Sequence, residues 1–280
     1  MKKTFLFLFI TAVIPMMAAC SVSVILTPDE EIQKAVKEND PSICAKIEDE
    51  DQGKTQKRRD RCYEEIAIEY NNPMNCMEIQ DQARQDNCDK AIAITNKEPD
   101  LCEVIDDVWK KNDCFMQVAE VKEDPLICGK IDDNNRNKSM CYSKVAVARK
   151  NQEICGNIDK ESEKLGCIAD VASVKEDLEL CETLKEYDST YYSCTSAIAS
   201  KQNNPDLCNN LAVTKSRNYK NACFEDTAIM AKDYKTCELI EDTDDRDSCL
   251  SKIGRNNKIP EACEKITDEK RKEICSRLAK

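Results

Sequence analysis

Apolar residues return along residues 40–280 in two alternating kinds of short stripe, and each kind predicts one helix. In the first kind, a cysteine is followed three residues later by isoleucine or leucine, which is helical spacing. In the second, a cysteine is followed four and five residues later by a β-branched residue and alanine, which marks one face of a helix. Polar stretches separate the stripes. The pattern therefore predicts a series of helical hairpins.

Eighteen of the nineteen cysteines set the period of this pattern. Eight gaps of fourteen residues alternate with nine gaps of twelve to eighteen, which gives nine units between Cys44 and Cys275. A period of about 26 residues is typical of stacked arrays, in which each unit buries its apolar face against its neighbours. We predict an all-α fold, an α-solenoid of about nine disulfide-stapled αα-hairpin repeats.

Capping residues indicate where the first helix of each unit begins. Four residues before the first cysteine, seven of the nine units carry Asp or Asn, and proline follows in six. An N-cap followed by proline at the first helical position is a strong start signal. Thr27-Pro28-Asp29-Glu30 has the form of a capping box and opens one more helix. Residues 27–39 are therefore predicted to form an N-terminal capping helix, and residues 40–280 the repeat array.

Two disulfide schemes fit the spacing, one within each hairpin and one across the constant gap. Three observations favour the first. It uses all eighteen thiols, it places insertions in a loop whose ends return to one place, and it needs no cysteine at Glu30, where the other scheme would require one. The favoured pairs are Cys44 with Cys62, Cys76 with Cys88, Cys102 with Cys114, Cys128 with Cys141, Cys155 with Cys167, Cys181 with Cys194, Cys208 with Cys223, Cys237 with Cys249, and Cys263 with Cys275.

Composition and the N-terminus indicate the compartment. Nine cysteine pairs are ordinary in an oxidising extracytoplasmic space and unusual in the cytosol. A basic start at Lys2 and Lys3 precedes an apolar run too short for a membrane span. Met17-Ala18-Ala19-Cys20 then resembles the lipobox of bacterial lipoprotein signal peptides, although leucine is commoner at the first position. The resemblance implies a signal peptide over residues 1–19, acylation of Cys20 by chains such as palmitate, and a lipidated tether over residues 20–26.

Net charge limits the partners. Without residues 1–19, 40 basic residues face 54 acidic ones, a formal charge of 40 − 54 = −14. Such a chain repels nucleic acid and anionic lipid, so we expect no nucleic-acid partner and attachment to a membrane through the acylated cysteine.

The residues needed for common catalytic and metal sites are scarce. The chain has no histidine and only five glycines, and no two cysteines are closer than twelve residues. Imidazole-dependent triads, His-containing zinc sites, Cys-x-x-Cys motifs and glycine-rich phosphate loops are thereby excluded. Acidic turns at residues 48–53 and 241–247 lack the ligand spacing of a calcium loop and are interpreted as solvated turns. We predict no catalytic residue, no metal site and no cofactor.

Aromatic residues gather near the second cysteine of several units. We expect them to pack between units rather than to form a ligand-stacking surface. They are Trp109, Phe115, Tyr142, Tyr191, Tyr192 and Phe224.

The predicted array resembles tetratricopeptide-like solenoids, particularly cysteine-rich bacterial versions with one disulfide per hairpin. The unit is about seven residues shorter and lacks the tetratricopeptide Trp, Gly and Tyr signature, so no functional residue carries over. The function expected is a non-enzymatic repeat scaffold, anchored in the cell envelope and facing the periplasm or the exterior, that binds a protein or peptide. Two alternatives stay open: a hydrolase acting on the envelope or peptidoglycan, and a structural spacer without a specific ligand.

Overall fold

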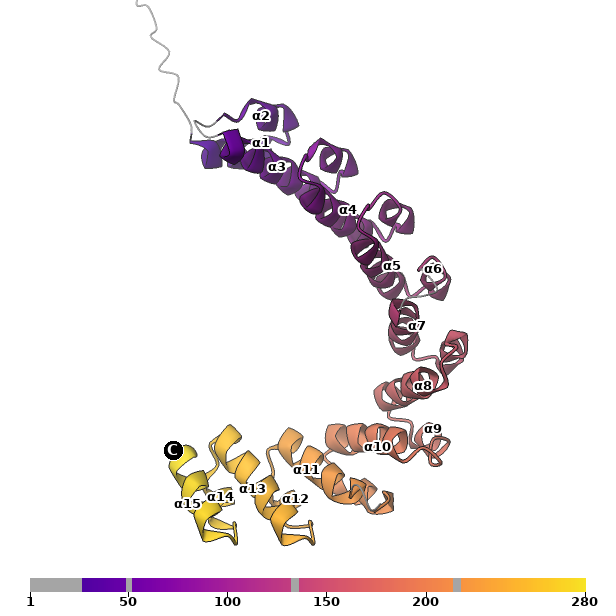
Figure 1. The fold of residues 1–280 in the computed structure, drawn as a ribbon, viewed down its shortest axis with the longest axis vertical. Helices are drawn as coiled ribbons and strands as arrows, with labels where there is room; N and C mark the ends of the chain where they lie inside the picture. The colour runs from indigo at the N-terminus through magenta and orange to yellow at the C-terminus, as the bar shows by residue number, and fades with distance from the viewer. Residues whose placement is uncertain (1–26, 49–51, 132–135, 214–217) are drawn as a thin grey trace, which may run out of the picture.

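The computed structural model describes residues 27–48, 52–131, 136–213 and 218–280. The predicted signal peptide, the tether and Cys20 lie outside these residues. The described chain is all-α, and its helices follow one another along a curved arc rather than around a common centre (Figure 1). This confirms the predicted solenoid.

Nine units follow the capping helix α1 (Pro28–Glu38), and each consists of a short helix and a long helix. The short helices are α2 (Pro41–Lys46), η1 (Pro73–Glu78), η2 (Pro99–Cys102), α6 (Pro125–Cys128), η3 (Gln152–Asn157), α9 (Leu178–Glu182), η4 (Pro205–Asn210), α12 (Tyr234–Cys237) and α14 (Pro260–Glu264). The long helices are α3 (Gln52–Glu69), α4 (Gln82–Asn96), α5 (Val108–Lys122), α7 (Arg136–Arg149), α8 (Glu161–Lys175), α10 (Asp188–Gln202), α11 (Tyr219–Ala231), α13 (Thr243–Asn257) and α15 (Glu269–Leu278).

The long helices line the inner side of the arc from α3 to α8, and the short helices lie on its outer side (Figure 1). We call the surface that the long helices present, away from the short helices, the long-helix face.

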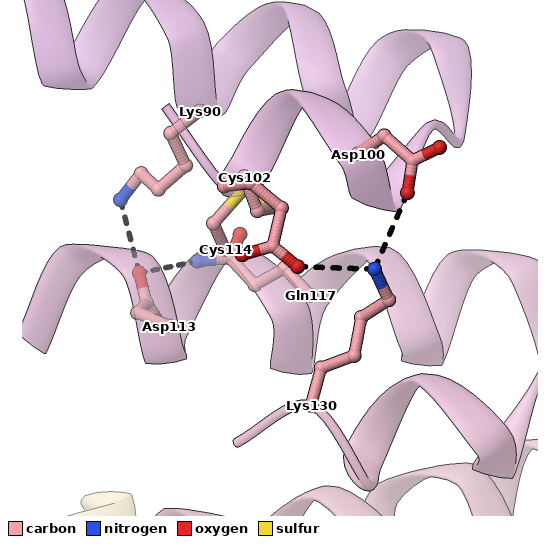
Figure 2. Close-up of a disulfide and its surroundings, with 8 residues drawn as sticks. Lys90, Asp100, Cys102, Asp113, Cys114, Gln117 and Lys130 are labelled. Atoms are coloured by element: carbon pink, nitrogen blue, oxygen red, sulfur yellow. Dashed lines mark hydrogen bonds and ion pairs between the residues drawn. A yellow bond between two sulfur atoms is a disulfide. The ribbon is translucent and has the colours of Figure 1, made fainter. Parts of the chain in front are cut away.

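Each unit is closed by one disulfide between its short and its long helix. The nine bonds are the predicted within-hairpin pairs, with Cα–Cα distances of 5.5 to 5.8 Å. Figure 2 shows the bond between Cys102 and Cys114, which joins η2 to α5. All eighteen sulfurs belong to buried residues. A short helix of four to six residues is too short to be stable alone, so the bond and the packing around it hold it in place.

A single left-handed residue explains why the gap between units is always fourteen residues. It ends α1 and the long helices of units 1 to 8, and in those eight units it lies nine residues after the second cysteine; Lys97, for example, has φ 58°. The last long helix, α15, ends at Ala279 in a right-handed conformation. The next residue donates its backbone N–H back to the helix, as Glu98 does to the Ala93 carbonyl at 2.9 Å. This Schellman-type turn has a fixed length and cannot absorb an insertion. The insertions fall instead in the loop inside each hairpin.

The left-handed residue is never glycine, although glycine adopts this conformation at the lowest cost. The nine residues are Asn39, Asn71, Lys97, Glu123, Lys150, Glu176, Asn203, Lys232 and Lys258.

The small residue five positions after the second cysteine allows the next unit to come close. It is a fully buried alanine in units 1 to 7. In unit 8 it is Gly254, where an added Cβ would lie 2.5 Å from Cys263 Sγ and 2.7 Å from Cys275 Sγ. The disulfide of one unit therefore packs against the long helix of the unit before it, and only a small side chain fits between them.

The predicted helix starts are confirmed. Thr27 and Glu30 form the expected capping box on α1, with the Thr27 N–H donating to Glu30 Oε2 at 2.7 Å. The seven Asp or Asn residues before the short helices each accept a backbone N–H. The short helices span only four to six residues, and four of them are 3₁₀ helices. The apolar residue three positions after each first cysteine lies beyond the end of its short helix and is buried.

Candidate functional site

The sequence-predicted site residues are cysteines, and the structure uses them for the frame. The eighteen paired cysteines carry no free thiol for redox chemistry or metal binding. In the described part of the chain, no three His, Cys, Asp or Glu side chains form a group that could hold a metal ion. The predicted lipidation residue, Cys20, lies outside the described residues. Any site on the array must therefore come from residues that the cysteine spacing did not single out.

Buried carboxylates two residues before the second cysteine fasten some units to the next. In unit 1, Asp60 accepts the backbone N–H groups of Gln80 and Asp81, both at 3.0 Å. In unit 8, Asp247 accepts those of Thr267 and Asp268 at 3.0 and 2.8 Å. We call this arrangement the carboxylate clamp. Because the acceptor is charged and almost fully buried, these bonds are among the stronger ones available to a protein.

The two acidic turns differ in what the structure describes. Residues 49–51 of the first turn lie outside the described residues. In the second turn, Asp242 caps α13 by accepting the Asp245 N–H at 2.9 Å, and Asp247 forms the carboxylate clamp. These two carboxylates thus cap a helix and join two units.

The aromatic residues near the second cysteines fall into three groups. Phe115, Tyr191 and Phe224 are buried and pack between units as predicted, and Tyr142 is partly buried against the same core. The prediction is wrong for Trp109, whose side chain is 71% exposed. It lies in the first turn of α5. Tyr192 is partly buried and lines a cavity.

Cavities lie between consecutive long helices on the long-helix face. One cavity, of about 670 Å³, lies between α10 and α11 and is lined in part by Tyr192, Ser196, Ala197, Ile229 and Met230. Another of about 420 Å³ separates α13 from α15. Two smaller adjoining cavities, of about 280 and 230 Å³, lie between α7 and α8. A row of open grooves across adjacent helices is suited to contact with an extended or irregular partner.

One carboxylate lies in the cavity between α10 and α11. Asp226 Oδ2 accepts the Tyr192 hydroxyl at 2.5 Å and the Ser196 hydroxyl at 2.9 Å. The Tyr192 ring also packs on Tyr219 of α11, with ring centroids 5.2 Å apart. The wall combines the apolar side chains of Ala197, Ile229 and Met230 with the polar ones of Ser193, Ser200 and Lys201. Met230 is 70% exposed. We call this cavity the α10/α11 groove.

A second carboxylate stands in the cavities between α7 and α8. Asp170 lines both of them together with Met140 and Ser143. Desolvation raises the pKa of Asp170 above its usual 3.8, although the side chain remains accessible from the solvent. We call this cavity pair the α7/α8 groove.

Among the described carboxylates, Asp89 on α4 has the most strongly shifted pKa. Its side chain is 6% exposed at a position where most other units carry aromatic or aliphatic residues. Burial, reinforced by the negative charge of Asp86, raises the pKa of Asp89 to about 6. Burial also acts on Asp86, but hydrogen bonds from Gln82 and Asp106 and the charge of Lys110 outweigh it and lower the pKa of Asp86. Asp89 opens into none of the grooves described above, so we assign it to the core.

Ion pairs cross the long-helix face from one unit to the next. Lys90 Nζ lies 3.0 Å from Asp113 Oδ2, and Figure 2 shows this pair beside the disulfide of unit 3. Lys144 Nζ lies 2.7 Å from Glu120 Oε2, and Lys201 Nζ lies 2.7 Å from Glu176 Oε1. Such exposed pairs contribute little to stability. They do, however, neutralise lysines that line the grooves.

Sequence reasoning missed Asp170 and Asp226, the two groove carboxylates. Both lie three residues after the second cysteine of their units, but acids are frequent in this chain and nothing in the sequence separates these two from solvated ones. Only the placement of neighbouring helices does so.

The chain matches no family model, no curated protein and no solved structure. Nine disulfides indicate an oxidising, extracytoplasmic environment. Within the described ranges, none of the helices has the length and apolar character that crossing a bilayer requires.

Proposed function

We propose that the protein is a non-enzymatic scaffold of the cell envelope, held on a membrane by an acylated Cys20, that binds a protein or peptide along its long-helix face. The observation that carries the proposal is the row of grooves between consecutive long helices on a frame with one disulfide per unit. A rigid frame lowers the entropy cost of binding, because the surface need not be ordered when the partner arrives.

Site-specific photo-crosslinking in cells tests the binding function. A crosslinking amino acid at Ala197, on the long-helix face, should trap one defined partner in the envelope. The matched control is Met77, an exposed residue on the short helix of unit 2. Equal crosslinking from both positions, or none from Ala197, would count against a specific binding face and favour a spacer.

The membrane attachment is tested separately. We expect mass spectrometry of the N-terminal peptide to find an acylated Cys20, and Cys20→Ser to move the protein from the membrane to the soluble fraction. An unmodified Cys20 would contradict the anchor.

A third measurement addresses the hydrolase alternative. We expect the purified protein to release no soluble fragments from isolated peptidoglycan. Release that is saturable in protein concentration would overturn the non-enzymatic assignment.

A further inference from the structure

Asp170 and Asp226 occupy the same position in units 5 and 7, and each faces a serine of the unit before it. That serine lies two residues after the second cysteine, at Ser143 and at Ser196. The two grooves therefore repeat one arrangement, a carboxylate beside a hydroxyl with apolar side chains in the wall, at an interval of two units. Unit 6 carries Ala197 at the carboxylate position, which separates the two acidic points.

Neither carboxylate forms an ion pair within the described part of the chain. Asp226 has its two hydroxyl donors, Tyr192 and Ser196, and these leave its charge uncompensated. Two lysines that line the grooves are engaged elsewhere, since Lys201 pairs with Glu176 and Lys144 with Glu120. Arg136 also lines the α7/α8 groove, where its charge acts on Glu163. Desolvation is the cause of the raised pKa of Asp170, with no cation opposing it. A charge in an apolar groove without a counter-charge is stabilised when a cation enters.

The walls indicate what kind of cation fits. Ile229, Met230 and Ala197 line the α10/α11 groove, and Met140 and Val147 line the α7/α8 groove. Lysine and arginine have an apolar stem that covers such surfaces and a charged head that pairs with a carboxylate. The net charge of the whole chain, −12, also attracts basic partners and repels nucleic acid and anionic lipid.

We propose that Asp170 and Asp226 are two subsites for Lys or Arg side chains of one basic, extended peptide segment that lies across α7 to α11. This inference rests on the proposed scaffold function and names the chemistry of its partner. Packed helix axes lie about 8 to 10 Å apart, so two units separate the subsites by roughly 16 to 20 Å. An extended chain advances about 3.3 Å per residue, which places the two basic residues about five or six positions apart.

Fluorescence anisotropy with a synthetic peptide tests the proposal. The probe is a labelled twelve-residue peptide of Ala, Ser and Leu with arginine at positions 3 and 9, and its control carries citrulline at both positions. Citrulline keeps the shape of arginine and removes its charge. With the mature, oxidised protein we expect the arginine peptide to bind at least tenfold more tightly, with an affinity that falls as salt is added.

Three variants locate the binding. Asp170→Asn and Asp226→Asn should each weaken binding of the arginine peptide about tenfold, while the citrulline peptide should not distinguish them from the wild type. Asp206→Asn is the matched control, because it removes the same charge from an exposed residue of η4, on a short helix. We expect it to change the affinity less than twofold. Circular dichroism and the mobility of the non-reduced chain confirm that each variant is folded and fully cross-linked.

Wild-type affinity in both groove variants would overturn the proposal, and so would equal loss in Asp206→Asn, which would show a general effect of net charge. Equal competition by spermidine would also overturn it, because a small cation would then fill the subsites without a peptide chain. These results leave the scaffold function standing as long as Ala197 still crosslinks to a partner. Loss of that crosslink is the failure of the scaffold function itself.

Discussion

The joint between units 1 and 2 and the joint between units 6 and 7 are built at the same point of the repeat from different chemistry. Two residues before the second cysteine, unit 1 has Asp60 and unit 6 has Tyr192. Asp60 binds two backbone N–H groups of the next unit. Tyr192 binds a side chain, the carboxylate of Asp226, and packs on Tyr219.

The two joints differ in role: the first holds two units together, and the second borders a groove that we propose binds a partner. A clamp on backbone N–H groups works whatever side chains the next unit carries, so Asp60 fixes the relative position of two units. The joint made through side chains borders the α10/α11 groove of about 670 Å³, and the clamped joint between units 8 and 9 borders a smaller cavity of about 420 Å³. Variation at one position of the repeat thus decides whether a joint is held through backbone N–H groups or through side chains.

Removal of a disulfide should produce the largest effect, and it should be similar in both regions. Cys76→Ala with Cys88→Ala in unit 2, and Cys208→Ala with Cys223→Ala in unit 7, open loops of 12 and 15 residues. We expect each pair to lower the local free energy of unfolding by about 3 to 4 kcal/mol, since closure entropy changes slowly with loop length.

Hydrogen exchange of the peptides in each unit measures this, with the intact unit of the same variant as an internal control. If exchange in the opened unit matches that of the wild type, the disulfide does not stabilise its unit and the interpretation of the disulfides as a frame is wrong.

Asp60→Ala should show the next largest effect. It removes the shared acceptor of Gln80 and Asp81, and we expect a loss of about 2 to 3 kcal/mol because bonds to a charged acceptor are strong. Asp60→Asn keeps one carbonyl acceptor and should lose less. Faster exchange confined to the amides of Gln80 and Asp81 and their unit would confirm a clamp, and a loss spread evenly over all nine units would contradict it.

Asp89→Asn should raise the free energy of unfolding, whereas the substitutions above should lower it. Because the folded state raises the pKa of Asp89 from 3.8 to about 6, its stability contribution is complete below about pH 3.8 and is lost as the pH rises through about 6. We expect Asp89→Asn to stabilise the protein at pH 7 by about 3 kcal/mol, at 1.36 kcal/mol per unit of pKa. The gain should disappear at pH 4.

Thermal unfolding followed by circular dichroism at pH 7 and pH 4 checks this, with Asp206→Asn as the exposed control. A gain of equal size at both pH values would contradict the assignment of Asp89 as a buried charge.

Tyr192→Phe should give the smallest effect, about 1 kcal/mol, because it removes one hydrogen bond and keeps the ring packed on Tyr219. Thermal unfolding and hydrogen exchange measure the loss, with the exchange of the α11 amides as the local reporter. A loss as large as that of Asp60→Ala would remove the distinction between the two joints.

Much of the frame was predictable because its signals are local. The distance from Cys76 to Cys88, the Asn72-Pro73 start and the Thr27 capping box each concern residues within one or two helices, so spacing alone determines what they do. The sequence shows the fourteen-residue gap but not its cause, the left-handed residue that ends the helix. Lys97 and Glu123 are not residues from which a left-handed conformation would be expected.

The sequence by itself determined the repeat, the pairing of the cysteines and the capping helix, because these depend on contacts close along the chain. The tertiary structure alone decided that Asp60 is a clamp, that Trp109 is exposed, and that Asp170 and Asp226 stand in grooves. These properties depend on how far one long helix lies from the next. That distance follows from the packing of all the side chains between two units, and no single residue determines it.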